Sequence, residues 1–103
     1  MKELQESVRK FCDQRKLNCR PTERVLDVIS ELGEVAKEIL KSGDYGKKPP
    51  EKSDAIREEL GDLLFSLMAL ANELDIDLEA SLDDALKKYE SRMELSGHPR
   101  SNG

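Results

Sequence analysis

The chain has 103 residues and a net charge of −5, with 17 basic and 22 acidic side chains. This length allows one domain, whose core is small enough that burial between subunits would add stability. The negative charge excludes general binding to a nucleic-acid polymer and disfavours docking on anionic lipid, because both need a basic surface. A negatively charged small molecule would be repelled by this acidic protein, and a bound divalent cation is the obvious way to offset that repulsion.

The residue types favour an all-α protein. Apolar residues make up 37% of the chain and charged residues 38%, with two Phe, two Tyr and no Trp, which suits amphipathic helices rather than a sheet sandwich. Cys12 and Cys19 are accompanied by a single histidine, so neither a zinc site nor a disulfide framework is indicated, and we expect two buried, reduced thiols. Since no apolar signal core or bilayer-spanning run is present, we expect a cytoplasmic protein without membrane contacts.

Two helices are predicted in the first part of the chain. Apolar residues at helical spacing predict a helix over residues 2–16, and this pattern fades before Pro21. A second apolar face predicts a helix over residues 22–42. We expect Thr22 to cap the start of this helix and Gly43 to end it.

Two more helices are predicted after a connection at residues 43–52, which contains two Gly and two adjacent Pro and should be exposed and mobile. Ser53 or Asp54 is expected to cap a third helix that runs to about Leu74. This helix is apolar on nearly all sides after its first turns, which is typical of a central helix. Asp77 is expected to cap a fourth helix, with an apolar stripe made of Leu78, Leu82, Leu86, Tyr89 and Met93.

The pattern predicts one four-helix domain over residues 1–95, followed by a disordered tail over residues 96–103. We expect the second and third helices to form a central antiparallel hairpin. Because one chain offers only a small core, we expect self-association into a homodimer or homotetramer to complete the fold.

Four carboxylates carry the functional signal. Glu31 and Glu34 lie one turn apart on the second predicted helix, and Glu59 and Asp62 lie one turn apart on the third. If these helices pack antiparallel across their short connection, the two pairs face each other. The alternative is that these acids form solvated stripes, which are common on amphipathic helices.

Four converging negative charges would require neutralisation. Like charges about 4 Å apart repel by roughly 4 kcal/mol at an effective dielectric constant near 20. Oxygen ligands without histidine or a usable cysteine select a hard cation, which indicates Mg²⁺ or Mn²⁺. Such a site leaves positions open for water and phosphate oxygens, and a spare carboxylate can accept the proton of an attacking water. The carboxylates therefore indicate metal-assisted hydrolysis of a phosphoanhydride.

The motifs ELGE at residues 31–34 and EELGDLLF at residues 58–65 resemble those of the MazG-like all-α nucleoside triphosphate pyrophosphatases. The 24 residues between Glu34 and Glu59 fit the spacing of that family, and the resemblance covers roughly residues 20–93. It implies a four-helix MazG-like unit in which Glu58 and Glu59 act in catalysis. It also implies that Mg²⁺ is bound by Glu31, Glu34, Glu59 and Asp62.

The same resemblance implies substrate contacts. Lys88, Tyr89 and Arg92 match a Lys-aromatic-x-x-Arg element that meets phosphate in relatives, although Tyr89 also fits the apolar stripe and the basic pair could be merely solvated. Relatives frequently carry Asn shortly before this lysine, where the chain has Leu86, and Asn72 could supply that contact. Without a tryptophan for base stacking, the aromatic candidates are Phe11, Phe65 and Tyr45.

The expected function is magnesium-dependent hydrolysis of a ribo- or deoxyribonucleoside triphosphate to the monophosphate and pyrophosphate, serving to clean the nucleotide pool. One alternative is a related activity on phosphoribosyl-ATP. A second alternative is a non-catalytic helical oligomerisation module with solvated acidic stripes. The module predicts no specific effect of Mg²⁺ on melting, whereas a converging acidic site predicts stabilisation by the ion.

Overall fold

The computed structural model describes residues 1–96, which form four helices, α1 (Lys2–Arg15), α2 (Pro21–Ser42), α3 (Asp54–Glu73) and α4 (Leu78–Ser96). The all-α class and the four predicted helices are confirmed. α4 includes residue 96, where the predicted tail begins, and the rest of that tail lies outside the described residues.

The predicted start of α2 is wrong by one residue. Arg20 is the N-cap and Pro21 is the first helical residue, so Thr22 already lies inside the helix. Proline suits this position because its fixed backbone angle matches the helix and because its missing N–H would have had no partner there. At the other end of α2, Gly43 is the C-cap, as predicted.

The predicted caps of the last two helices are confirmed for Ser53 and Asp77. The Ser53 hydroxyl accepts a hydrogen bond from the Ile56 N–H at 3.1 Å. The Asp77 carboxylate accepts hydrogen bonds from the N–H groups of Glu79 and Ala80 at 3.0 and 3.4 Å. Both side chains therefore satisfy amides that have no partner within their helix.

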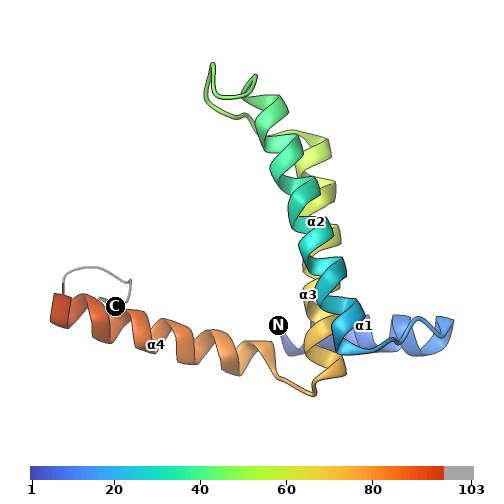
Figure 1. Cartoon of the computed structure of the whole chain (residues 1–103). Helices are drawn as coiled ribbons and strands as arrows, with labels where there is room; N and C mark the ends of the chain where they lie inside the picture. The colour runs from blue at the N-terminus through green and yellow to red at the C-terminus, as the bar shows by residue number, and fades with distance from the viewer. Residues whose placement is uncertain (97–103) are drawn as a thin grey trace.

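The helices α2 and α3 lie side by side and antiparallel, and α1 crosses α3 near the end of this hairpin that lies away from the 43–53 connection (Figure 1). The predicted hairpin and the central position of α3 are thus confirmed. The Cys12 thiol is buried as expected, but Cys19 is only half-buried, because it lies in the segment between α1 and α2. The buried apolar core consists of Cys12, Val35, Ile56, Met68, Ala69 and Ala71.

The connection between α2 and α3 is exposed after its first residue, as predicted. Gly43 is buried, and a Cβ atom at this position would lie 2.9 Å from the Lys48 carbonyl oxygen. The Lys48 N–H donates to the Gly43 carbonyl at 3.0 Å, which holds the two segments at this close approach. A side chain at position 43 would therefore force the turn apart.

The buried side chain of Gln5 fixes the turn between α3 and α4. Its Nε2 donates to the Ile76 carbonyl at 2.6 Å, and its Oε1 accepts from the Leu78 N–H at 3.0 Å. The Asn72 amide donates to the Gln5 backbone carbonyl at 3.0 Å. We call these three hydrogen bonds the Gln5 clamp. They join the start of α1 to the end of α3 and the start of α4.

Helix α4 points away from the hairpin, and its main contact is with α1 (Figure 1). Its predicted apolar stripe is therefore uncovered, with Leu86 55% and Met93 48% exposed. The outer face of α2 is similar, with Leu26 65% and Ile29 61% exposed. The radius of gyration is 16.6 Å, whereas a compact domain of this length has about 13 Å.

No helix within residues 1–96 combines the length and the apolar character that crossing a membrane requires.

Candidate functional site

Three of the four predicted metal ligands converge between α2 and α3. Glu31 on α2 and Glu59 and Asp62 on α3 each place a carboxylate oxygen within 4.8 Å of the others. We call these three residues the acidic cluster. It forms because antiparallel packing brings the middle of α2 opposite the second and third turns of α3, so residues that are far apart in sequence face each other.

Glu34 lies outside the acidic cluster, and a neighbouring lysine engages its carboxylate. The Lys37 ammonium lies 2.8 Å from a Glu34 carboxylate oxygen and 4.0 Å from one of Glu38. The hydrogen bond from Lys37 to Glu34 and the nearby negative charges raise the pKa of Lys37, which favours the charged form of this amine. Its charge partly balances the acids on this side of the hairpin.

The pKa of Glu59 is raised above its ordinary value. Loss of hydration around this half-buried carboxyl is the main cause, followed by the negative charges of Asp62, Glu34 and Glu31. Lys37 acts in the opposite direction. Glu34 is therefore close enough to influence Glu59 electrostatically, even though its oxygen atoms do not join the acidic cluster.

The acidic cluster suits a hard divalent cation. All its donors are carboxylate oxygens, which fit Mg²⁺ or Mn²⁺ and do not fit the softer metals that select histidine or thiolate. The repulsion from neighbouring carboxylates, which adds to the loss of hydration in raising the Glu59 pKa, is what a bound dication would relieve. The free Cys12 and Cys19 thiols belong to other parts of the fold, on α1 and in the segment that follows it.

Glu58, the predicted catalytic neighbour, is exposed and does not belong to the acidic cluster. It follows Arg57 and precedes Glu59 on α3, so its side chain leaves the helix about 100° away from that of Glu59. A water held by the acidic cluster and a base at Glu58 would thus occupy adjoining sides of the same helical turn.

The predicted substrate contacts are not brought to the acidic cluster within one chain. Lys88, Tyr89 and Arg92 lie on α4, which points away from the hairpin (Figure 1). The Lys88 ammonium lies 5.4 Å from the centre of the Tyr89 ring. Asn72 lies ten residues beyond Asp62, about 15 Å along the axis of α3, and it belongs to the Gln5 clamp.

Two of the predicted aromatic candidates meet. The rings of Phe11 and Phe65 lie 5.7 Å apart in an edge-to-face arrangement, and the Arg15 guanidinium covers the Phe11 ring at 4.0 Å. Tyr45 is 69% exposed in the connection between α2 and α3. The aromatic pair therefore belongs to the contact between α1 and α3.

Sequence reasoning missed Lys37 and Arg24. Lys37 follows Glu34 by three residues, a spacing that places the two side chains together on a helix and could have revealed the pair. Arg24 is 7% exposed; its guanidinium donates to the Leu17 carbonyl and contacts the Cys12 sulfur at 3.7 Å. It ties the segment after α1 to the start of α2, and no sequence signal distinguishes it from a surface arginine.

The chain is similar to proteins of one family. Residues 20–95 match the MazG nucleotide pyrophosphohydrolase domain. The uncharacterized protein YpjD of Bacillus subtilis is 37% identical over 94 residues, which cover 89% of this chain and 85% of YpjD. The phosphoribosyl-ATP pyrophosphatase of Methanosphaerula palustris is 34% identical over 64 residues, which cover 62% of this chain and 60% of that protein.

Solved structures agree with this assignment. The crystal structure of YpjD from Bacillus subtilis superimposes with a TM-score of 0.74 at 39% identity, covering 89% of this chain and 94% of that one. The Bacillus-conserved MazG protein, a nucleotide pyrophosphohydrolase, superimposes with a TM-score of 0.72 at 31% identity, covering 85% and 86% of the two chains. With its acidic cluster on the central hairpin, the chain belongs to the MazG nucleotide pyrophosphohydrolase family.

Proposed function

We propose that the chain hydrolyses ribo- or deoxyribonucleoside triphosphates to the monophosphate and pyrophosphate in a magnesium-dependent reaction. The observation that carries this proposal is the convergence of Glu31, Glu59 and Asp62 within 4.8 Å. These residues belong to the two motifs that resemble those of the family and lie within the matched residues 20–95. Nucleotide-pool cleaning in the cytoplasm is the cellular role that we propose for this reaction.

In this proposal Glu31, Glu59 and Asp62 hold Mg²⁺, for which Mn²⁺ can substitute. Glu34 becomes the fourth ligand when Lys37 releases its carboxylate. When bound, the ion supplies positive charge for the phosphoryl oxygens and lowers the pKa of a bound water.

Glu58 and Glu59 are the proposed catalytic carboxylates. Glu59 belongs to the acidic cluster and positions the attacking water, while the exposed Glu58 accepts the proton of that water. The two residues are adjacent on α3, so one helix backbone carries both side chains. A helix is a rigid support for this purpose.

The geometry of α4 supports a site shared between copies of the chain. Lys88, Tyr89 and Arg92 lie on α4, which points away from the hairpin of its own chain and carries an uncovered apolar stripe. We propose that self-association into a homodimer or homotetramer buries this stripe and brings the basic residues of one copy to the phosphates held by another. Asn72 is the proposed substrate contact at the far end of α3.

Phosphoribosyl-ATP is a second candidate substrate. The similarity to the phosphoribosyl-ATP pyrophosphatase of Methanosphaerula palustris favours it, at 34% identity over 64 residues. Both candidates present a phosphoanhydride to the same carboxylates, so they differ in the part of the substrate that lies beyond the phosphates.

The test is hydrolysis of a panel of nucleoside triphosphates and phosphoribosyl-ATP with Mg²⁺, with phosphate measured with and without added inorganic pyrophosphatase. A signal that requires the coupling enzyme supports the proposal. Glu59→Ala and Asp62→Ala should abolish this signal and keep the helical circular dichroism, while Glu51→Ala in the exposed connection should keep full activity. Retained turnover in both cluster variants would overturn the site. No product from any substrate, with no effect of Mg²⁺ on melting, would favour a non-catalytic module.

A further inference from the structure

We propose that Lys37 is a phosphate-binding residue of the candidate site. In the metal-free chain its ammonium pairs with Glu34, and when Glu34 ligates the metal ion this ammonium passes to a phosphate oxygen of the nucleotide. The inference rests on the proposed function, because it names the cation that the same chain offers to the phosphates of that substrate.

Lys37 lies on the flank of the acidic cluster. It follows Glu34 by one turn of α2, and its ammonium is 2.8 Å from a Glu34 carboxylate oxygen. Its positive charge also acts on Glu59 across the hairpin, where it opposes the effect of the neighbouring acids on the pKa of that residue. The Lys37 side chain is 57% exposed, so a ligand has access to its ammonium. Lys37 is thus an accessible cation at the edge of the three converging carboxylates.

Lys37 keeps one distant partner once Glu34 turns to a metal ion. Within residues 1–96, its ion pairs are those with Glu34 and Glu38, and the Glu38 oxygen is 4.0 Å away. The same oxygen has a second cation nearby, since the Lys41 ammonium lies 3.7 Å from it. Glu38 therefore has a partner without Lys37, and the Lys37 ammonium becomes available to another anion.

The charge balance of the site favours such a cation. The four predicted metal ligands carry four negative charges when ionised, and a dication offsets two of them. The phosphates of a nucleotide would therefore still meet a negative surface. An ammonium released from Glu34 offsets part of this remaining charge and can donate directly to a phosphate oxygen. A lysine suits the exchange because its ammonium is a compact charge with three donors on a flexible stem.

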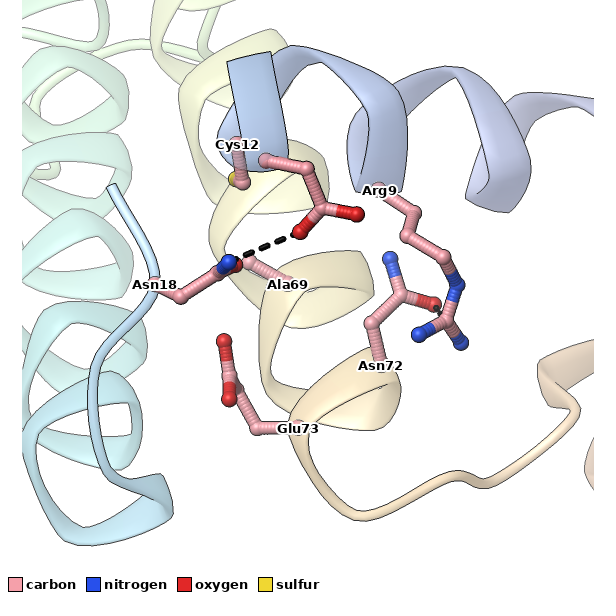
Figure 2. A pocket seen from close by; sticks show the side chains of 7 residues that line it. Arg9, Cys12, Asn18, Ala69, Asn72 and Glu73 are labelled. Atoms are coloured by element: carbon pink, nitrogen blue, oxygen red, sulfur yellow. Dashed lines mark hydrogen bonds between the residues drawn. The ribbon is translucent and has the colours of Figure 1, made fainter. Parts of the chain in front are cut away.

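Other basic side chains near the hairpin are less suited to this role. Arg57 precedes Glu59 by two residues, so the two side chains leave α3 about 200° apart. Arg9 lies at the far end of α3, beside a cavity of about 170 Å³ whose lining includes Asn72 and Glu73. Figure 2 shows the Arg9 guanidinium beside Asn72, to whose side-chain oxygen it donates at 3.4 Å. About 15 Å along the helix axis separate Asn72 from the acidic cluster, so Arg9 does not reach the phosphates held there.

The first experiment measures binding without turnover. The α,β-methylene analogues of ATP, GTP, CTP and UTP, which cannot be hydrolysed at that bridge, are titrated by calorimetry into the full chain with saturating Mg²⁺. Lys37→Gln should weaken the best-bound analogue about tenfold, and Lys37→Arg should restore most of this affinity, because a guanidinium also pairs with phosphate. Lys41→Gln removes the same charge one turn further along α2 and should bind like the wild-type chain. Wild-type affinity in Lys37→Gln, or no binding by the wild-type chain, would overturn the inference.

A second measurement distinguishes the phosphate contact from a structural role. Without nucleotide, Lys37→Gln should bind Mg²⁺ more tightly than the wild-type chain, because the competing ammonium is gone from Glu34. Damage to the site would weaken the binding of metal and analogue together. In a chain labelled with ¹³C-lysine, the Lys37 ε-methylene signal, identified by its absence from Lys37→Arg, should move on addition of Mg²⁺ and again on addition of the analogue. The lack of a second change would contradict the transfer to phosphate.

Turnover separates this inference from the proposed function. If the wild-type chain cleaves nucleotides, Lys37→Gln should raise KM with little effect on kcat, because it removes a contact made in both the bound substrate and the transition state. Cleavage with an unchanged KM in this variant refutes the role of Lys37 and leaves the proposed function standing. If the wild-type chain cleaves nothing but its binding of the analogue depends on Lys37, the proposed function fails and the phosphate contact stands.

Discussion

The ammonium of Lys37 lies 2.8 Å from a carboxylate oxygen of Glu34, the one predicted metal ligand that does not join the three converging carboxylates. A positive charge at this position opposes an incoming dication and competes for one of its ligands. Lys37→Gln should therefore increase the affinity for Mg²⁺ by about twofold to fivefold, the range expected for an exposed ion pair. Isothermal titration with Mg²⁺ in the absence of nucleotide measures this change. Lys41→Gln, one turn further along α2, is the matched control, and weaker binding by Lys37→Gln would contradict the role assigned to the pair.

The metal-free protein should lose stability as the pH rises above the ordinary range of a glutamate. Because the pKa of Glu59 is raised in the folded state, the folded chain binds this proton more tightly than the unfolded chain does. The resulting stabilisation is fully present below pH 4.5, the ordinary pKa, and is lost as the pH rises through the folded pKa. Glu59→Gln should thus raise the melting temperature at pH 7 in EDTA and lose this advantage below pH 4.5. Glu58→Gln is the control, and equal behaviour of the two variants would show that the acidic cluster is not the cause.

A single charge introduced into the apolar stripe of α4 should disrupt self-association of the chain. Leu86 is 55% exposed in one chain, and burying a leucine at an interface contributes about 2 kcal/mol. Leu86→Glu should shift the protein toward a smaller assembly in sedimentation velocity at micromolar concentration. Ser91→Glu adds the same charge on a different side of α4 and should leave the mass unchanged. An identical mass for wild type and Leu86→Glu would exclude this stripe as the interface.

Removal of the Gln5 side chain should destabilise the fold. The substitution Gln5→Ala leaves the Ile76 carbonyl and the Leu78 N–H without their partner. We expect a loss of about 2 kcal/mol in the free energy of unfolding, measured by urea denaturation. The exposed Gln14→Ala on the same helix should change this free energy little, so a similar loss in both variants would point to the composition of α1 and not to the clamp.

Local signals in the sequence predicted much of the fold. Ser53 and Asp77 act on amides two or three residues away, so their caps are readable without knowledge of the tertiary structure. Thr22 was assigned by the same logic and is wrong, because Pro21 begins the helix one residue earlier. The apolar stripe of α4 was also predicted, but periodicity does not reveal which surface covers it, and within one chain it remains exposed.

The candidate site was predicted in part. Antiparallel packing of two motif-bearing helices sufficed to place Glu31 opposite Glu59 and Asp62. Glu34 was predicted as a metal ligand together with these residues. The sequence does not reveal whether its flexible side chain pairs with a metal ion or with Lys37, which lies one turn away. The cavity at Glu73 was not foreseen, because it depends on where the segment after α1 lies across α3. Such placement results from long-range packing.

The Gln5 clamp also affects the order in which the parts of the molecule can fold. The hydrogen bond between Gln5 and Leu78 joins residues 73 positions apart, whereas the α2–α3 hairpin closes across the 43–53 connection. During synthesis, the hairpin and its acidic cluster can therefore form while α4 is still inside the ribosome. The direction of α4 is set only when its first residues meet α1. The nascent chain thus completes its carboxylate site before it gains the means to present α4 to another copy.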